Sequence, residues 1–255
     1  SIEQGINLPS SEELIEQIEY LIHSGDFEEA LRQCEVALRL KENHLDLLCL
    51  RGVVYQLLDQ TPKALEQFRG ITQIDPSCTL AWSHIAIISL DNLELEDAQY
   101  AISRGLQSDP ISAEGWWLRS LYRELKGDLS GAERALFHAH RLDPQGIQLL
   151  PELSEAHIRE IALSALQGLL GDIQSLSPFL TLSVETAPTE TILKGEDMWH
   201  SPLHILTHVR KTPFEVICFR QNIRRHTQQG LDLEQHFSSL FTENLADLLG
   251  SDQES

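Results

Sequence analysis

The sequence predicts a mainly helical protein, in which a stack of four two-helix repeats is followed by a small α+β domain. Two observations carry this prediction. A 34-residue period runs without interruption through the first 144 residues, which is typical of repeat architectures. After Pro144 the period disappears, and segments with alternating apolar residues indicate strands between segments of helical periodicity.

The period is defined by six columns of residues that recur at the 34-residue step with no insertion. One column holds alanine in every repeat, another begins with leucine and continues with tryptophan, and the last holds proline in three of four repeats. The columns are Ala30, Ala64, Ala98 and Ala132; Leu14, Leu48, Trp82 and Trp116; Ile18, Gly52, Ala86 and Ser120; Cys34, Phe68, Ile102 and Leu136; Ala37, Ile71, Gly105 and Ala139; and Glu42, Pro76, Pro110 and Pro144.

Each repeat reads as two helices joined by a turn. Gly25 and Gly127 stand at such turns, where glycine adopts a left-handed backbone at low cost. The small residues of the columns let two helices approach closely, and the large residues fill the facing holes. Proline after the second helix prevents its continuation. Because one repeat cannot bury its own apolar face, the repeats are expected to stack on their neighbours.

These columns resemble the tetratricopeptide repeat (TPR) family, most clearly in Trp82-x2-Ile85-Ala86 and in the stretch from Trp116 to Pro144. The resemblance covers residues 11–146 as repeats 11–44, 45–78, 79–112 and 113–146, after an N-terminal extension of residues 1–10. It implies a right-handed superhelix. Four positions depart from the family pattern. Asp59 and Leu93 replace the usual turn glycine, and Arg51 and Arg119 stand at a position that is normally apolar.

The resemblance also implies an interaction scaffold whose concave groove is lined by the first helix of each repeat. Members of the family that clamp acidic chaperone tails carry Lys, Arg and Asn in this groove, whereas the residues here are mostly apolar or acidic. The expected partner is therefore an apolar or basic peptide or domain. The alternative, that these residues pack against the C-terminal domain, stays open. The groove residues carried over are Ile15, Glu19, Cys49, Val53, Leu57, Ser83, Ile87, Leu90, Trp117, Leu121 and Leu125.

The C-terminal part is predicted to begin with a capping or linking helix within residues 147–170, with helical periodicity over 151–170. Alternation over 179–185 and the apolar run 214–219 predict two strands. The polar stretch 195–213 is expected to be irregular, and a closing helix is expected over 232–249. Residues 171–255 would thus form the α+β domain.

This order resembles the minimal zincin-like metallopeptidases of bacteria, through the phrase Glu185-x2-Pro188-x-Glu190 and the segment Val216–Ile223. A zincin needs His-Glu-x-x-His, whose two imidazoles bind one zinc while the glutamate activates its water. Here the corresponding positions hold Thr242, Glu243 and Ala246. The resemblance therefore implies a pseudo-enzyme domain without catalytic residues, and no cofactor is expected.

Two other clusters can be weighed from the sequence. His200, His204 and His208 recur at four-residue steps and on a helix would share one side, where they could bind Zn²⁺, Ni²⁺ or Cu²⁺, but Pro202 interrupts such a helix. These residues are a weak metal candidate. The basic group at Arg220, Arg224, Arg225 and His226 is expected to pair with carboxylates of the chain itself, and His236 and Glu243, seven residues apart, could face together.

Charge and composition exclude several classes of protein. Lys and Arg number 19 against 39 Asp and Glu, a net charge of −20, which opposes binding to nucleic acid or to an anionic membrane. The apolar runs fall short of the roughly 20 residues that a membrane span requires. The four cysteines form no CxxC, and no apolar leader opens the sequence, so a cytoplasmic protein is expected.

Three functions are compatible with the sequence. The first is a protein–protein interaction adaptor or regulatory subunit, which binds a partner through the TPR groove, the pseudo-metallopeptidase domain or both. The second is a TPR chaperone of a bacterial secretion system, which the additional C-terminal domain makes less fitting. The third is a metalloenzyme that uses His200, His204 and His208.

Overall fold

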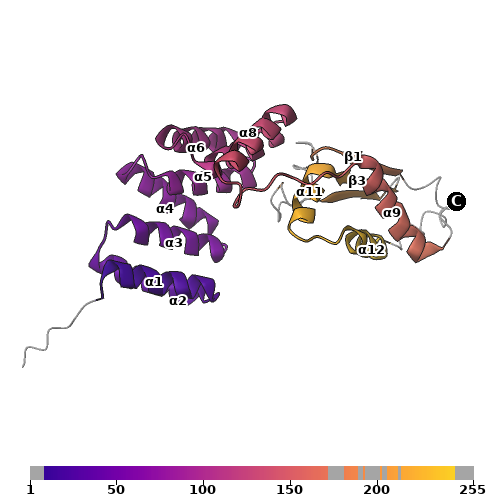
Figure 1. Ribbon diagram of the computed structural model, residues 1–255. Helices are drawn as coiled ribbons and strands as arrows, with labels where there is room; N and C mark the ends of the chain where they lie inside the picture. Colours follow the sequence, from indigo (N-terminus) through magenta and orange to yellow (C-terminus); the bar gives the residue numbers. More distant parts are fainter. Residues whose placement is uncertain are drawn as a thin grey trace, which may run out of the picture. The chain divides into compact units, whose positions relative to one another are not determined.

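The computed structural model of the chain describes residues 9–171, 181–188, 192, 202, 206–211 and 214–244 (Figure 1). Their contacts divide the chain into two compact units, Ser1–Tyr122 and Arg123–Ser255. The division falls inside helix α7, Ala113–Leu125. Among the helices of the described ranges, none is both long and apolar enough to cross a membrane.

The first unit is built from antiparallel helix pairs that follow the predicted period (Figure 1). The second helices of the four repeats begin at Phe27, Thr61, Leu95 and Leu129, each 34 residues after the one before. Within this unit α3 packs on both α2 and α4, and α5 packs on both α4 and α6. The helices are α1 (Ser11–His23), α2 (Phe27–Leu40), α3 (Leu45–Leu57), α4 (Thr61–Ile74), α5 (Thr79–Asp91) and α6 (Leu95–Ser108), followed by α7.

The tryptophan and proline columns are joined by the same hydrogen bond in two successive repeats. The indole Nε1 of Trp82 donates to the carbonyl oxygen of Pro76 at 2.8 Å. One period later, Nε1 of Trp116 donates to the carbonyl oxygen of Pro110 at 2.9 Å. The indole therefore fixes the chain as it leaves one repeat and enters the next, which explains why the two columns recur together.

The turns inside the four repeats share one backbone conformation although their residues differ. Gly25 and Gly127 have φ angles of 81° and 78°, and Asp59 and Leu93 at the equivalent positions have 55° and 58°. The two departures from glycine therefore keep the left-handed geometry that the turn needs, at a cost in backbone strain. The repeat period is preserved because the conformation is preserved.

The second unit contains the second helix of the fourth repeat together with a small α+β fold. Its sheet has the strand order β1-β3-β2, with β1 parallel and β2 antiparallel to β3. Strands β2 and β3 are consecutive in the sequence and also neighbours in the sheet. Strand β1 pairs with β3 and not with β2, the strand that follows it in the sequence. The elements are α8 (Leu129–Leu142), α9 (Glu155–Leu170), β1 (Thr181–Glu185), β2 (Thr207–Lys211), β3 (Phe214–Phe219), α11 (Arg220–Gln228) and α12 (Leu233–Glu243).

The core of this unit lies between the sheet and two helices. Alternate residues of β3, such as Val216 and Cys218, join the cluster formed by Ile158 of α9 and Phe237 of α12. Helices α9 and α12 pack against each other on this face. On the opposite face, Ile217 and Phe219 form a second small cluster with Ile192. Strand β3 is therefore covered on both faces, as its continuous apolar sequence indicates.

Three features of the C-terminal part differ from the sequence prediction. The stretch 195–213, expected to be irregular, contains β2, whose sequence Thr-His-Val-Arg-Lys is too polar and too short to be recognised as a strand. Helix α9 begins at Glu155 because the hydroxyl of Ser154 accepts the amide hydrogen of His157. Residues 220–228, for which no element was predicted, form α11. The predicted helix 232–249 is observed over Leu233–Glu243, and its last residues lie outside the described ranges.

Candidate functional site

The predicted groove residues lie on the first helices α1, α3, α5 and α7, but they differ in accessibility. Glu19 and Leu57 are exposed. Ile15, Val53, Ile87, Trp117 and Leu125 are partly exposed. The side chains of Cys49, Ser83, Leu90 and Leu121 are buried and unavailable to a partner in this conformation. Leu125 belongs to the second unit. We call the accessible members within the first unit the first-helix face: Ile15, Glu19, Val53, Leu57, Ile87 and Trp117.

The first helices also carry exposed carboxylates in their first turns. Glu12, Asp46 and Glu114 occupy one column of the repeat, and all three are exposed. Negative charge at a helix N-terminus is stabilised by the helix dipole, so these positions are favourable for an acidic residue. Arg51 of α3 donates two hydrogen bonds to the side-chain oxygen of Gln67, at 2.9 and 2.5 Å. The first helices therefore present apolar and acidic groups together with partly exposed arginines, Arg51, Arg119 and Arg123.

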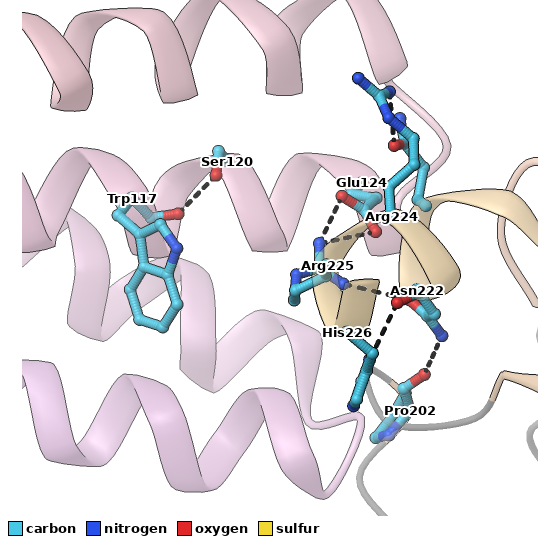
Figure 2. Close-up of polar contacts among 9 residues, drawn as sticks. Trp117, Ser120, Glu124, Pro202, Asn222, Arg224, Arg225 and His226 are labelled. Atoms are coloured by element: carbon cyan, nitrogen blue, oxygen red, sulfur yellow. Dashed lines mark hydrogen bonds and ion pairs between the residues drawn. The ribbon is translucent and has the colours of Figure 1, made fainter. Parts of the chain in front are cut away.

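A second group of polar contacts centres on α11 in the second unit (Figure 2). The Nη2 atom of Arg225 donates to both carboxylate oxygens of Glu124, at 3.0 and 2.9 Å. The two side chains are 12% and 7% exposed. A second nitrogen of the same guanidinium, Nη1, donates to Oδ1 of Asn222 at 3.1 Å. The sequence prediction that this basic group pairs with a carboxylate of the chain is confirmed for Arg225.

The neighbouring arginine of α11 binds the main chain instead of a carboxylate. Arg224 donates from Nε to the carbonyl oxygen of Pro151 at 2.7 Å and from Nη2 to that of Leu150 at 3.2 Å. Gln228 donates to the carbonyl oxygen of Leu149 at 2.9 Å. These bonds hold α11 against the segment that leads into α9 and satisfy carbonyl groups that no strand or helix pairs.

Two further bonds fix the other side of α11 (Figure 2). The amide nitrogen of the Asn222 side chain donates to the carbonyl oxygen of Pro202 at 2.9 Å. The Nδ1 atom of His226 lies 2.8 Å from the carbonyl oxygen of Asn222, and because a carbonyl only accepts, this nitrogen is the donor. Helix α11 begins directly after β3, and its polar composition conceals it in the sequence. The signal that could have revealed it is the absence of Gly or Pro from Arg220 to Gln228.

Of the three histidines that the sequence offers as a weak metal candidate, the structure describes His208 alone. His208 lies on β2 and not on a helix, so the expected helical arrangement with His200 and His204 is wrong for this residue. His200 and His204 lie outside the described residues. Within the ranges that the structure describes, no group of three or more His, Cys, Asp and Glu side chains could hold a metal ion.

The positions of the degenerate zincin motif lie at the end of α12. Thr242 and Glu243 are exposed, and the hydroxyl of Thr242 donates to the carbonyl oxygen of Ser238 at 2.7 Å. Ala246 lies outside the described residues. Burial lowers the pKa of His236, and the charge of Glu243 opposes this shift.

Two solved structures of other proteins resemble this chain. One is a tetratricopeptide repeat protein from Parabacteroides merdae, 14% identical, with a TM-score of 0.53 over 94% of this chain and 87% of that chain. The other is TTC0263, a thermophilic TPR protein in Thermus thermophilus, 17% identical, with a TM-score of 0.50 over 67% of this chain and 88% of that chain. No family model and no curated protein matches the sequence.

At this level of identity the comparisons establish the fold alone. Both neighbours are TPR proteins, so the predicted TPR segment is confirmed. Neither neighbour is described as a metallopeptidase, and the zincin-like interpretation of the C-terminal part gains no support from them.

Proposed function

We propose that this chain is a non-catalytic adaptor or regulatory subunit that binds another protein through the first-helix face. The observation that carries the proposal is the repetition of accessible apolar and acidic side chains on successive first helices, as at Glu19, Val53, Leu57 and Ile87. Soluble proteins seldom repeat such a pattern on one face unless a partner covers it. The chemistry of the face favours a partner segment that is apolar or basic.

The proposal assigns binding, and not catalysis, to the C-terminal part as well. The positions that would need imidazoles for zinc are Thr242 and Ala246. A metal measurement on tag-free protein tests this point independently. Stoichiometric zinc, nickel or copper that is lost on changing His204→Ala would replace the adaptor proposal with a metalloenzyme.

The partner is identified by affinity purification from the native cell followed by mass spectrometry, with the intact chain as bait. The informative variant is Leu57→Lys, which introduces a positive charge at an apolar position that is 41% exposed. Its matched control is Leu40→Lys, at a leucine of α2 that is 56% exposed and outside the first-helix face. We expect the partner to be lost with Leu57→Lys and retained with Leu40→Lys.

Trp117→Ala provides a second test at the fourth repeat, because this side chain is partly exposed. Leu121→Glu is unsuitable, since Leu121 is 4% exposed and a buried glutamate without a counter-ion would destabilise the helix pair. Partner capture that is unchanged by both Leu57→Lys and Trp117→Ala would place the binding surface elsewhere. Capture of no specific protein by the wild-type chain would refute the adaptor proposal.

A further inference from the structure

Two of the four cysteines are neighbours in the structure although they belong to different repeats. Cys49 lies in α3, and Cys78 is the residue immediately before α5. A hydrogen bond links the two side chains. Both residues are part of the first unit, Ser1–Tyr122. The two thiols are therefore already in contact while both are reduced.

The start of α5 does not depend on the thiol of Cys78. In the first repeat the hydroxyl of Ser10 accepts the amide hydrogen of Glu13 at 3.2 Å and caps α1. In the fourth repeat the hydroxyl of Ser112 accepts the amide hydrogen of Gly115 at 3.0 Å. The side chain of Cys78 makes no such capping bond. The residues that precede the four first helices are Ser10, His44, Cys78 and Ser112.

The packing of α3 does not require sulfur at Cys49 either. The equivalent positions of the other repeats hold side chains of very different size and polarity, namely Ile15, Ser83 and Trp117. The side chain of Cys49 is 5% exposed. The repeat pattern thus explains a residue at each of the two positions, but it explains neither the two thiols nor their contact.

The two thiols differ in their access to solvent. Cys78 is partly exposed, whereas Cys49 is buried. Burial, together with the charge and the hydrogen bond of Cys78, raises the pKa of the Cys49 thiol to about 12. A reagent from solvent therefore meets Cys78 first. Once Cys78 is bonded to another sulfur it can no longer carry a charge, which removes one cause of the raised pKa of Cys49.

We propose that Cys49 and Cys78 form a modification site, at which exchange with a low-molecular-weight disulfide such as oxidised glutathione joins the second and third repeats by a reversible disulfide. The thiolate of Cys78 attacks one sulfur of the small disulfide, and the other half leaves and takes up the proton that Cys78 lost. The thiolate of Cys49 then attacks Sγ of Cys78, and the second half leaves as a thiol. Two thiols of the chain are oxidised and one small disulfide is reduced to two thiols, so no other reactant is needed.

The bond would join two first helices that carry accessible apolar residues, Leu57 on α3 and Ile87 on α5. Oxidation would therefore fix the spacing between the second and third repeats, and reduction would release it. A cross-link also restricts the unfolded chain, so the oxidised form is expected to be the more stable one. The site itself does not depend on the proposed adaptor function.

The test incubates the intact folded chain in buffers of reduced and oxidised glutathione. After an acid quench, the remaining thiols are blocked with N-ethylmaleimide in denaturant, and the digested chain is mapped by mass spectrometry. We expect one cross-linked pair of peptides, carrying Cys49 and Cys78, while Cys34 and Cys218 are found alkylated. Dithiothreitol should reverse the bond. The oxidised chain should unfold at a temperature about 5–10 °C higher than the reduced chain.

Three variants assign the roles of the cysteines. Cys78→Ser introduces the residue that precedes two other first helices, and it should form no disulfide and show no shift in unfolding temperature. Cys49→Ser introduces the residue found one period later, and oxidation should stop at a mixed disulfide between Cys78 and glutathione. The matched control is Cys34→Ala, at a buried cysteine of the same unit, which should be oxidised like the wild-type chain.

Two results would overturn the site. One is a folded wild-type chain in which Cys78 stops at the mixed disulfide, so that Cys49 behaves as if it were absent. The other is a chain in which both thiols remain alkylated in fully oxidised glutathione buffer. If Cys49→Ser fails to fold, Cys78→Ser and the wild-type chain decide between these results and the expected one.

The disulfide and the adaptor function are tested separately. If the bond between Cys49 and Cys78 forms while neither Leu57→Lys nor Trp117→Ala affects capture of the cellular partner, the modification site stands and the binding surface lies elsewhere. If no disulfide forms while Leu57→Lys abolishes capture, the modification site is wrong and the adaptor function stands.

Discussion

The imidazole ring of His84 lies face to face with the phenyl ring of Phe68, with 4.5 Å between the ring centroids and 1° between the ring planes. At the equivalent positions of the neighbouring repeats the sequence has Leu50 and Leu118. His84 therefore takes the place of an apolar residue in the packing of α4 against α5. Burial lowers its pKa from 6.5 to about 4, and its Nδ1 atom has no hydrogen-bond partner among the described residues.

The burial of His84 makes the stability of the repeats depend on pH. In the unfolded chain His84 takes up a proton near pH 6.5, whereas in the folded chain it stays neutral down to about pH 4. The unfolded state therefore binds more protons between these values, and the free energy of unfolding falls as the pH is lowered from 6.5 to 4. We expect His84→Leu to remove this part of the dependence. The measurement is urea unfolding of both proteins at pH 7 and pH 5.

The comparison must use the difference between the two proteins, because burial also lowers the pKa of His236 in the second unit. That histidine contributes equally to wild type and variant and cancels. An equal loss of stability in both proteins between pH 7 and pH 5 would show that His84 is not responsible.

Gly52 is required by the close approach of α3 to Phe68. A β-carbon added at this glycine would lie 2.7 Å from the nearest atom of the phenyl ring. Gly52→Ala should therefore destabilise the chain by about 1–3 kcal/mol, as overpacking of a core does. The matched control is Gly70→Ala in α4, where the added β-carbon meets nothing within 4 Å. This change should stabilise by about 0.5–1 kcal/mol because alanine favours a helix over glycine. Equal effects of the two changes in chemical denaturation would contradict the packing.

Asp59 stores backbone strain in the turn between α3 and α4. Its φ angle is 55°, in the left-handed region that glycine occupies at the equivalent turns. We expect Asp59→Gly to stabilise the chain by about 0.5 kcal/mol, since relief of strain exceeds the added freedom of the unfolded chain. The converse change, Gly25→Ala at φ 81°, should destabilise it. Thermal unfolding of the two variants distinguishes a strained turn, in which the shifts have opposite signs, from a permissive one.

The cysteines are expected to differ in reactivity. Burial raises the pKa of Cys34, Cys49 and Cys218 to about 12 each. At pH 8 a thiol with that pKa is ionised to roughly one part in 10,000, and the thiolate is the reactive form. Cys78 is partly exposed, so iodoacetamide should modify it first in the native chain. Peptide mass mapping after brief treatment, with and without urea, gives the order; early modification of Cys34 in native protein would be inconsistent with its burial.

The repeats could be predicted from the sequence because each position of the period carries a local physical requirement. Alanine stands where two helices are in close contact. The indole of Trp82 donates a hydrogen bond to the carbonyl oxygen of Pro76, which precedes the helix that carries the tryptophan. Even the turns at Asp59 and Leu93 follow from the period, although their residues alone do not indicate a left-handed backbone. Because the same structural requirement recurs in each repeat, the period can be recognised even where the residue of one repeat departs from the pattern.

The C-terminal part lacks such repetition. Strand β2 is stabilised by pairing with β3, a tertiary contact that leaves no alternating pattern in Thr-His-Val-Arg-Lys. Helix α11 is fixed by bonds to distant carbonyl groups, such as that of Pro151, which no local pattern reveals. Among the groove residues, the period predicted the helices that carry them but not their depth, so Leu90 and Leu121 proved to be buried. The pairing of Arg225 with a carboxylate was predictable from the charge excess, whereas the identity of Glu124 was not.

The division of contacts inside α7 has a practical consequence for any attempt to dissect the chain. A fragment ending at residue 146, where the sequence period stops, would retain Glu124 while discarding its counter-ion Arg225. In such a fragment the carboxylate of Glu124 at the end of α7 would be buried without a counter-ion, so we expect the fragment to be less stable than the same residues in the whole chain. Arg225 is therefore needed to compensate the charge at the end of α7, although it stands 101 residues after Glu124 in the sequence.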